Sequence, residues 1–213
     1  HRRNRGKLFF SSYRHYPDVV MNPHNNGNFM FVGTAVVNGR YTRPAYTNEI
    51  KPMFTLFPSF VKSLPISRKD RSYLENFVFE AAENYTENYR DAWENYYKSF
   101  SVKANNLGSL KIILTMMQLP SSPFNDFQEN ILENTNIAKT TTEDPRKLRY
   151  LGLLRNKLKD FQPIHRLIQS SKQKGKAKKA EGKAVIPNPD DPARLMVSFF
   201  GPFYGDYNII ALD

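Results

Sequence analysis

The sequence predicts a mainly α-helical fold, a helical bundle with a small β element formed by N- and C-terminal strands. Residues 72–100 carry apolar side chains at every third or fourth position, which is the period of an α-helix. Strand-like stretches occur near the two ends of the chain, at 27–37 and 197–213. With 40% apolar and 14% aromatic residues, the chain has enough apolar side chains to fill a core.

Four consecutive segments are expected along the chain. Residues 1–70 mix extended pieces with short helices, and residues 71–171 form the helical bundle. Residues 172–189 form a basic and proline-rich linker, because the lysines of this run have no apolar face beside them. Residues 190–213 form a β-hairpin, in which two apolar runs flank a Gly-Pro and a Tyr-Gly-Asp turn.

The first segment contains one clear strand signal, the stretch GNFMFVGTAVV. It is followed by Asn38-Gly39, a dipeptide that is typical of a hairpin turn. Four prolines then interrupt residues 44–65, so we expect any helix in this part to be short, because proline lacks the backbone N–H that a helix interior needs.

The helix at residues 72–100 has an aromatic stripe, which we interpret as core. An aromatic cage for a ligand is the alternative, but a stripe at helical spacing favours burial against neighbouring helices. The later helices contribute further apolar side chains to this core. The expected core residues are Phe77, Tyr85, Tyr89, Trp93, Tyr96, Phe127, Leu151 and Leu154.

Turn chemistry marks the starts of two later helices. Ser122 is placed as an N-cap with Pro123 at the first helical position, and Pro145 begins another helix. Leu148 and three further leucines are expected to face inward from the second of these helices. His165 lies on an apolar face after it, where a packed or capping histidine is expected rather than a catalyst.

Catalytic, metal-binding and cofactor-binding residues are not expected. The chain has no cysteine, and its four histidines show neither the His-Glu-x-x-His spacing nor an i, i+4 pair on one helix face. No nucleophile elbow, phosphate-binding glycine loop or dinucleotide fingerprint occurs. The paired acids Asp190-Asp191 and Glu143-Asp144 lie in polar loops next to prolines, where solvated carboxylates are typical. The sequence therefore indicates a non-enzymatic protein.

The net charge of +11 is concentrated outside the expected bundle, in residues 1–14 and in the lysine run 172–183. Such runs are typical of solvated tails and linkers. A basic nucleic-acid-binding protein that uses residues 172–183 remains an alternative function, and it predicts affinity with a steep salt dependence. Specific nucleic-acid recognition is not expected.

The C-terminal stretch VSFFGPFYGDYNIIALD raises the question of which strands it pairs with. We expect its partners to be N-terminal strands such as GTAVV, because an unpaired apolar edge is an aggregation hazard. Its aromatic side chains are candidate interaction residues for another protein: Phe199, Phe200, Phe203, Tyr204 and Tyr207.

Motifs spread over residues 35–170 resemble the C-terminal periplasmic region of the TssM/IcmF family, inner-membrane proteins of type VI and type IVB secretion systems. They occur in the family's order: a Tyr-Thr-Arg element, a Tyr-x-x-x-Tyr-x-x-x-Trp helix, a Ser-Pro helix start and a Phe-x-Pro-Ile-His segment. The last three are represented by Tyr85, Tyr89 and Trp93, by Ser122 and Pro123, and by Phe161, Pro163 and His165.

This resemblance implies a structural scaffold in the periplasm, as part of an inner-membrane protein. It implies binding to an outer-membrane lipoprotein of the TssJ kind and to other subunits of the secretion complex, and self-association into a homo-oligomer. Any membrane anchor is expected outside residues 1–213. The longest apolar stretch, residues 110–120, has about half of the roughly 20 residues that cross a bilayer as a helix.

A second resemblance covers residues 179–213, KAEGKAVIPNPDDPARLMVSFFGPFYGDYNIIALD. This segment is similar to strands of the bacterial lipocalin family, outer-membrane lipoproteins that bind lipids in an eight-stranded barrel. The family's Gly-x-Trp entry strand does not occur in the sequence, and a few strands cannot close a barrel around a ligand. A lipid-binding carrier of lipocalin type is the alternative function that this resemblance implies.

Overall fold

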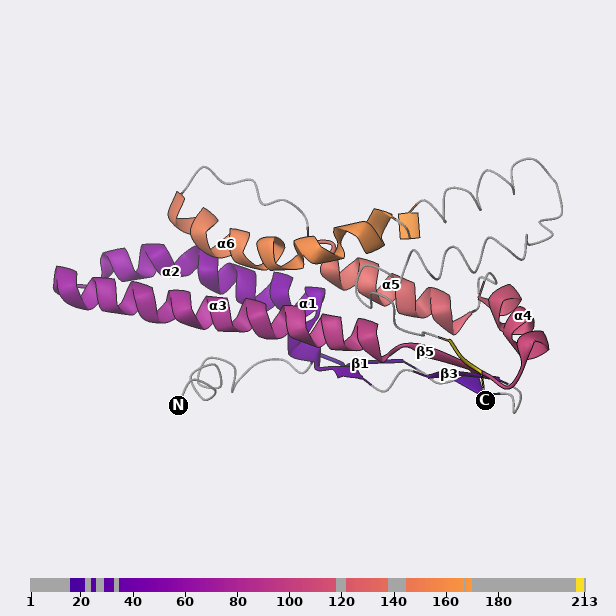
Figure 1. Ribbon diagram of the computed structural model, residues 1–213. Coiled ribbons are helices and arrows are strands. Elements are labelled where there is room, and N and C mark those ends of the chain that lie inside the picture. The colour runs from indigo at the N-terminus through magenta and orange to yellow at the C-terminus, as the bar shows by residue number, and fades with distance from the viewer. Residues whose placement is uncertain are drawn as a thin grey trace. The chain divides into compact units, whose positions relative to one another are not determined.

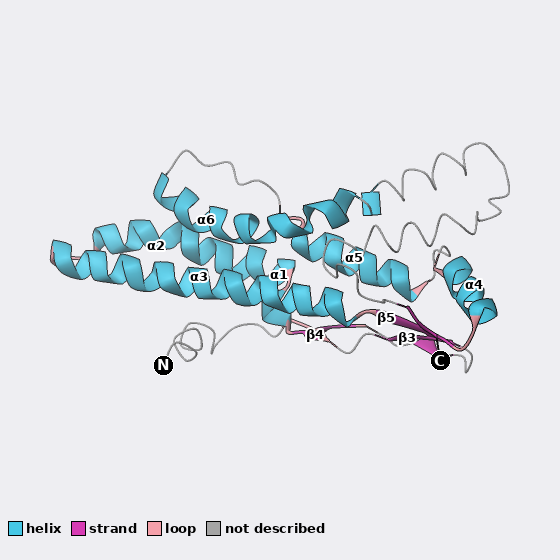
Figure 2. Cartoon of the chain, in the orientation of Figure 1, coloured by secondary structure: helices cyan, strands magenta, loops and turns pink. Residues whose placement is uncertain are grey.

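The computed structural model describes residues 16–21, 24–25, 29–32, 35–117, 122–137, 145–166, 168–169 and 210–212 (Figure 1). Helices dominate these residues and the strands are short, which confirms the mainly α-helical fold (Figure 2). None of the helices in these ranges is both long and apolar enough to span a bilayer.

The helices and strands follow one another along the chain in this order: β1 Val19–Val20, β2 His24–Asn25, β3 Phe29–Val32, β4 Val36–Val37, η2 Gly39–Tyr41, α1 Arg43–Ala45, η3 Tyr46–Ile50, α2 Lys51–Ser63, α3 Arg68–Ser99, β5 Ser101–Ala104, α4 Leu107–Met116, α5 Pro123–Thr135, α6 Pro145–Lys157, η4 Leu158–Phe161 and β6 Ile210–Leu212. β1 and β4 pair with each other as a two-stranded sheet.

The chain divides into two compact units, and each is built from segments that are distant in the sequence. The described residues of the first unit lie within His1–Val19, Val37–Trp93 and Ile137–Lys159. Those of the second lie within Val20–Val36, Glu94–Asn136 and Asp160–Asp213. This division differs from the four consecutive segments expected. α3 contributes residues to both units, and each unit also contains segments that precede α3 and segments that follow it.

In the first unit, the expectation of only short helices between residues 44 and 65 is wrong. α1, η3 and α2 follow one another without a break, and α2 contains Pro58 in its interior. Pro44 lies in the first turn of α1, where the backbone N–H that proline lacks would have no partner within the helix. Pro52 lies at the start of α2, directly after the π-turn η3. Burial of Phe54, Pro58 and Val61 offsets the hydrogen bond that Pro58 cannot make.

Aromatic contacts join α2, α3 and α6 within the first unit. The rings of Phe54 and Tyr150 stack at a centroid distance of 5.7 Å, and the Tyr150 hydroxyl donates to the carbonyl of Glu75 over 3.3 Å. Tyr150 also meets Phe79 edge-on, and the Arg149 guanidinium lies 3.8 Å from the centre of the Phe79 ring. α6 begins at Pro145 as predicted, but Leu148, expected to face inward, is 42% exposed.

The hairpin turn expected at Asn38-Gly39 does not form. Asn38 instead caps η2, and its side chain accepts a hydrogen bond from the N–H of Arg40. The Gly39 N–H donates to Asp18 over 2.8 Å, which holds residues 16–18 against η2. A Cβ at residue 39 would collide with the backbone of Tyr16, so this close approach requires glycine.

α3 carries the aromatic stripe, one residue out of register with the expectation at its start. Val78 and Ala82 are buried and Phe77 is only half-buried, because Phe77 lies about 100° around the helix from Val78. Farther along, the expected core residues are buried: Tyr85, Tyr89, Trp93 and Tyr96, together with Tyr97.

The second unit contains a four-stranded sheet with the order β2-β3-β5-β6. β3 runs antiparallel to β5, with Phe31 opposite Val102, and β6 runs parallel to β5, with Ile210 opposite Val102. N-terminal strands and the C-terminal strand therefore belong to one sheet, as expected. The described residues of the ending, however, pair directly with β5, the strand after α3, and not with GTAVV. β5 was not predicted, because its four residues between two helices are too few to show the alternation of apolar and polar side chains that is typical of a strand. The rest of the expected C-terminal hairpin lies outside the described residues.

α5 begins as predicted in the second unit. The Ser122 hydroxyl accepts a hydrogen bond from the N–H of Phe124 over 3.2 Å, and Pro123 is the first helical residue. Phe124 and Phe127 then pack against Phe100 from the segment after α3, with ring centroids 5.4 and 4.6 Å from it. This cluster of phenylalanines forms the core on which the candidate site is built.

Candidate functional site

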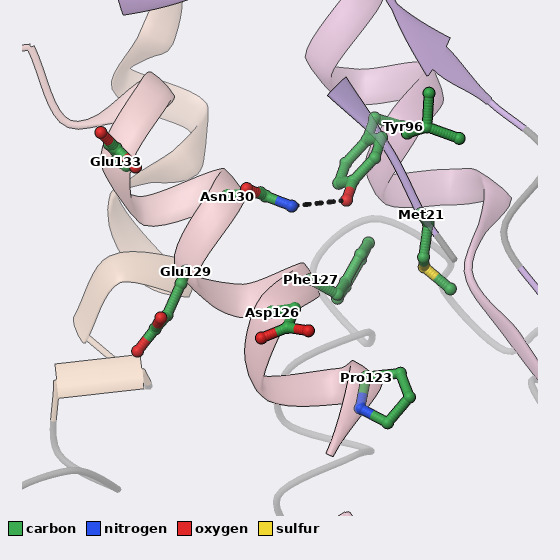
Figure 3. Close-up of a pocket in the computed structure, with 9 residues that line it drawn as sticks. Met21, Tyr96, Pro123, Asp126, Phe127, Glu129, Asn130 and Glu133 are labelled. Atoms are coloured by element: carbon green, nitrogen blue, oxygen red, sulfur yellow. Dashed lines mark hydrogen bonds between the residues drawn. The ribbon is translucent and has the colours of Figure 1, made fainter. Parts of the chain in front are cut away.

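A pocket of about 330 Å³ lies beside α5 in the second unit (Figure 3). One wall is the exposed side of α5, and the opposite side is formed by Val20 and Met21 and by Tyr96 of α3. Side chains from three separate parts of the sequence therefore meet here, which is typical of a binding site.

The floor of the pocket consists of two aromatic residues that the sequence placed in the core. Tyr96 and Phe127 are fully buried, and their rings stack at a centroid distance of 5.4 Å. The Asn130 amide donates to the Tyr96 hydroxyl over 3.2 Å. Burial raises the pKa of Tyr96 above its ordinary value, and the charge of Asp126 adds to this effect, so the phenol stays neutral.

The rim of the pocket is acidic. Asp126, Glu129 and Glu133 follow one another along one face of α5 at spacings of three and four residues, and all three are exposed. Carboxylates around an aromatic floor suit a cationic side chain, or an apolar side chain flanked by cations, from another protein. In the part of the chain that the structure describes, no group of three or more histidines and acids is arranged to hold a metal ion.

The tyrosines of the first unit do not form a ligand cage. The ring of Tyr85 lies 5.7 Å from that of Tyr41, 6.5 Å from that of Tyr46 and 6.0 Å from that of Tyr89, so these side chains pack on one another. Burial raises the pKa of Tyr46 to about 12 and also raises the pKa of Tyr89. Neutral phenols at these positions have no tendency to act as bases.

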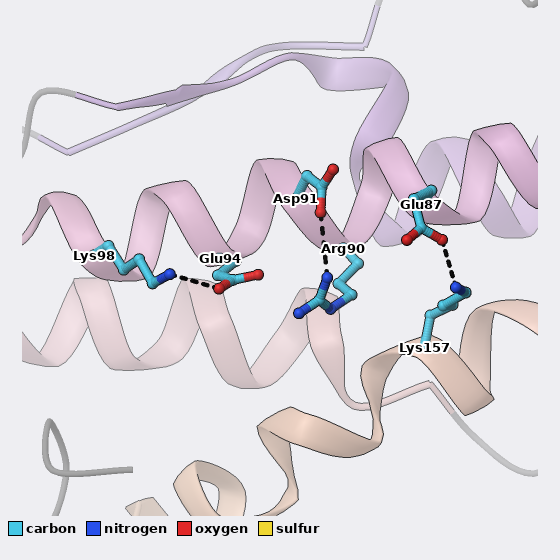
Figure 4. Close-up of polar contacts among 6 residues, drawn as sticks. All are labelled: Glu87, Arg90, Asp91, Glu94, Lys98 and Lys157. Atoms are coloured by element: carbon cyan, nitrogen blue, oxygen red, sulfur yellow. Dashed lines mark hydrogen bonds and ion pairs between the residues drawn. The ribbon is translucent and has the colours of Figure 1, made fainter. Parts of the chain in front are cut away.

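Charged side chains on α3 make structural contacts (Figure 4). Lys98 pairs with Glu94 over 2.6 Å within the helix, and Arg90 lies 3.4 Å from Asp91. Lys157 of α6 pairs with Glu87 over 2.5 Å, which links two helices of the first unit. All these pairs are at least partly exposed, and none of them lines the pocket.

His165 is a packed histidine of the second unit. It is 8% exposed, and its Nε2 lies 2.7 Å from the hydroxyl of Thr135 at the end of α5. That hydroxyl also donates to the carbonyl of Ile131, so Nε2 is the donor to Thr135 when both contacts are made. Desolvation by burial lowers the pKa of His165 to about 4, and the ring is neutral at pH 7.

The structure separates the expected core residues into two groups. Tyr96 and Phe127 meet in the second unit, whereas Tyr85, Tyr89, Trp93, Leu151 and Leu154 are buried in the first. The aromatic interaction candidates at residues 199–207 lie outside the described residues. The acidic rim was missed, although its spacing opposite the phenylalanines of α5 was visible in the sequence.

Comparison with known proteins finds only short similarities. No family model and no solved structure matches the chain. The chain is 63% identical to the outer membrane lipoprotein Blc of Citrobacter freundii over 35 residues, which cover 16% of this chain and 20% of that protein. The proteins of the same name from Vibrio cholerae and Escherichia coli K12 are 54% identical over 43 residues and 55% identical over 40 residues.

The chain spans a quarter or less of the length of these curated relatives. The match of 35 residues has the same length as segment 179–213, which resembles the lipocalin family. A similarity of this extent does not assign the chain to a family.

Proposed function

We propose that this chain is a non-enzymatic scaffold of the bacterial envelope, the periplasmic part of a TssM/IcmF-like component of a secretion-system membrane complex. In this role it binds an outer-membrane lipoprotein of the TssJ kind and other subunits of the complex, and it self-associates. The observation that carries the proposal is the pocket beside α5, where an aromatic floor and an acidic rim offer a binding site for a protein side chain.

The geometry of the pocket favours a protein partner over a small reactive substrate. Its charged groups are three exposed carboxylates on one helix, whereas acid-base chemistry on a substrate relies on carboxyl groups that are buried. Its apolar part is the edge of a packed aromatic core. A partner with a basic residue beside an apolar one fits such a surface, because charge complementarity selects the partner and the aromatic floor supplies contact area.

An envelope location is part of the proposal. The relatives with short similarity are named outer membrane lipoproteins, and the TssM/IcmF resemblance implies the periplasm. Two separate parts of the sequence therefore support a location in the envelope.

Binding of the purified chain to a soluble TssJ-like lipoprotein tests this function. We expect saturable binding, weakened about tenfold by the double substitution D126N and E133Q. The matched control E83Q and D91N removes two exposed charges from α3 and is expected to change the affinity less than twofold. Absence of binding by the unmodified chain would contradict the proposal. Equal effects of the two double variants would show that the pocket beside α5 is not the site of binding.

A lipid-binding carrier is the second candidate function, favoured by the similarity to Blc. A carrier needs an enclosed apolar cavity, and lipocalin-type barrels are closed by antiparallel neighbours. In the described sheet β6 is instead a parallel neighbour of β5. Solvent extraction of the purified chain followed by mass spectrometry of lipids tests this candidate. A lipid found in stoichiometric amount would support the carrier function, and the absence of any bound lipid would contradict it.

A further inference from the structure

The hairpin formed by α2 and α3 exposes apolar side chains at its closed end. We call residues 56–73 the hairpin tip. It carries the three most exposed large apolar side chains among the described residues: Tyr73 at 71%, Leu56 at 67% and Phe60 at 58%. Leu64 and Ile66 in the connecting loop are half-buried. Three large exposed apolar side chains within one helix hairpin point to an interaction site.

The hairpin tip is held in one shape by its own hydrogen bonds. The Arg71 guanidinium donates to the carbonyl of Leu64 over 3.3 Å. The Ser67 hydroxyl exchanges hydrogen bonds with Asp70, donating to its carboxylate over 2.7 Å and accepting from its N–H over 3.1 Å. The loop between the helices is thus capped at the start of α3, and its apolar residues are presented on a fixed support.

Cations surround these apolar side chains. Lys62, Arg68 and Lys69 are exposed on the two sides of the loop. The only acid between residues 56 and 73 is Asp70, and its carboxylate is already engaged by Ser67. α2 itself has a lysine near each end and no acid at all. The partner of the hairpin tip must therefore combine an apolar region with negative charge.

We propose that the hairpin tip docks on the surface of an anionic lipid bilayer. Leu56 and Phe60 enter the boundary between head groups and acyl chains, and Lys62, Arg68 and Lys69 contact the lipid phosphates. Apolar side chains beside lysines and arginines are the combination that binds such a surface, through buried apolar area and attraction to anionic lipid.

Two other partners fit the hairpin tip less well. A second copy of the chain would place the same cations opposite one another across a two-fold axis, and like charges repel. Duplex nucleic acid would satisfy the cations but leave Phe60 and Leu56 exposed to water, because its backbone offers phosphates and sugars only. The docking does not depend on the proposed partner protein, since the pocket beside α5 contributes nothing to it.

Sedimentation with lipid vesicles tests the proposal, using the full chain and two kinds of vesicle. One kind is phosphatidylcholine alone, and the other is phosphatidylcholine and phosphatidylglycerol in equal parts. We expect binding only to the second kind, weaker at high salt. The triple variant K62Q, R68Q and K69Q is expected to weaken binding on the order of a hundredfold. The double variant L56S and F60S is expected to weaken it about tenfold.

A matched triple variant separates this site from the general positive charge of the chain. K103Q, K111Q and K159Q remove three exposed lysines elsewhere, and we expect less than a threefold effect on vesicle binding. An equal effect of both triple variants would overturn the proposal. So would unchanged vesicle binding by L56S and F60S, or a concentration-dependent dimer that this double variant abolishes. Circular dichroism and thermal unfolding establish that each variant is folded.

Discussion

The two units differ in how their aromatic clusters are held together, although α3 contributes to both. In the first unit, tyrosine and tryptophan side chains donate hydrogen bonds to backbone carbonyls of η2. The Tyr85 hydroxyl donates to the carbonyl of Arg40 over 2.9 Å, and the Trp93 indole N–H donates to that of Tyr41 over 2.7 Å. In the second unit, the rings of Phe100, Phe124 and Phe127 pack on one another, with centroids 4.6 to 6.3 Å apart.

This difference shows what fixes the packing arrangement of the aromatic cluster in each unit. A buried hydroxyl or indole needs a hydrogen-bond partner, so the first cluster is compatible with one position of η2 only. A phenylalanine cluster imposes no such demand, and it tolerates changes that conserve volume. We therefore expect the first cluster to be sensitive to loss of polar groups and the second mainly to loss of volume.

The largest effect is expected from Trp93→Ala, which removes the largest buried side chain and a hydrogen bond. The free energy of unfolding should fall by about 3 to 5 kcal/mol. Trp93→Phe retains an aromatic ring but leaves the carbonyl of Tyr41 without its indole donor. We expect this variant to lower the free energy of unfolding by about 1 to 2 kcal/mol. Chemical denaturation measures both values. Unchanged stability of Trp93→Ala would contradict the core assignment of α3.

Phe127→Ala tests the second cluster, with an expected loss of about 3 to 4 kcal/mol from the cavity it leaves. Phe127→Leu nearly conserves the volume and should cost less than about 1.5 kcal/mol. Amide hydrogen exchange should rise most in residues 94–136 for Phe127→Ala and in residues 37–93 for Trp93→Ala. Equal exchange profiles of the two variants would show that the clusters do not stabilise separate units.

A pH effect distinguishes the second unit through His165. Its pKa is about 4 in the folded chain and about 6.5 in the unfolded chain, so between these values the unfolded chain binds more protons. Stability should be nearly unaffected above pH 6.5 and should fall by roughly 3 kcal/mol as the pH drops to 4. Denaturation of the chain and of His165→Gln across this range measures the effect, and the variant should lack this part of the pH dependence.

The smallest effect is expected from the ion pair between Glu87 and Lys157. Their side chains are 48% and 41% exposed, so solvent screens the pair and it should contribute about 0.5 kcal/mol. A double-mutant cycle with Glu87→Gln and Lys157→Met measures this coupling. A coupling above about 2 kcal/mol would mean that the packing of α3 against α6 depends on charge as well as on apolar contacts.

Local signals in the sequence predicted a large part of the helical architecture. The aromatic period of α3, the cap at Ser122 and the start at Pro145 act within a few residues, so they do not depend on the rest of the fold. The candidate site was predicted only in part. Tyr96 and Phe127 were recognised as core, but their meeting with Met21 depends on a contact between residues far apart in the sequence.

The sequence by itself determined the periods, caps and charges of this chain, because these depend on spacing within single elements. Only the tertiary structure decided that Pro58 stays inside a helix, that Asn38-Gly39 begins η2 and that β5 lies between β3 and β6. Each of these is set by partners distant in the chain, whose packing and hydrogen bonds outweigh weak local preferences.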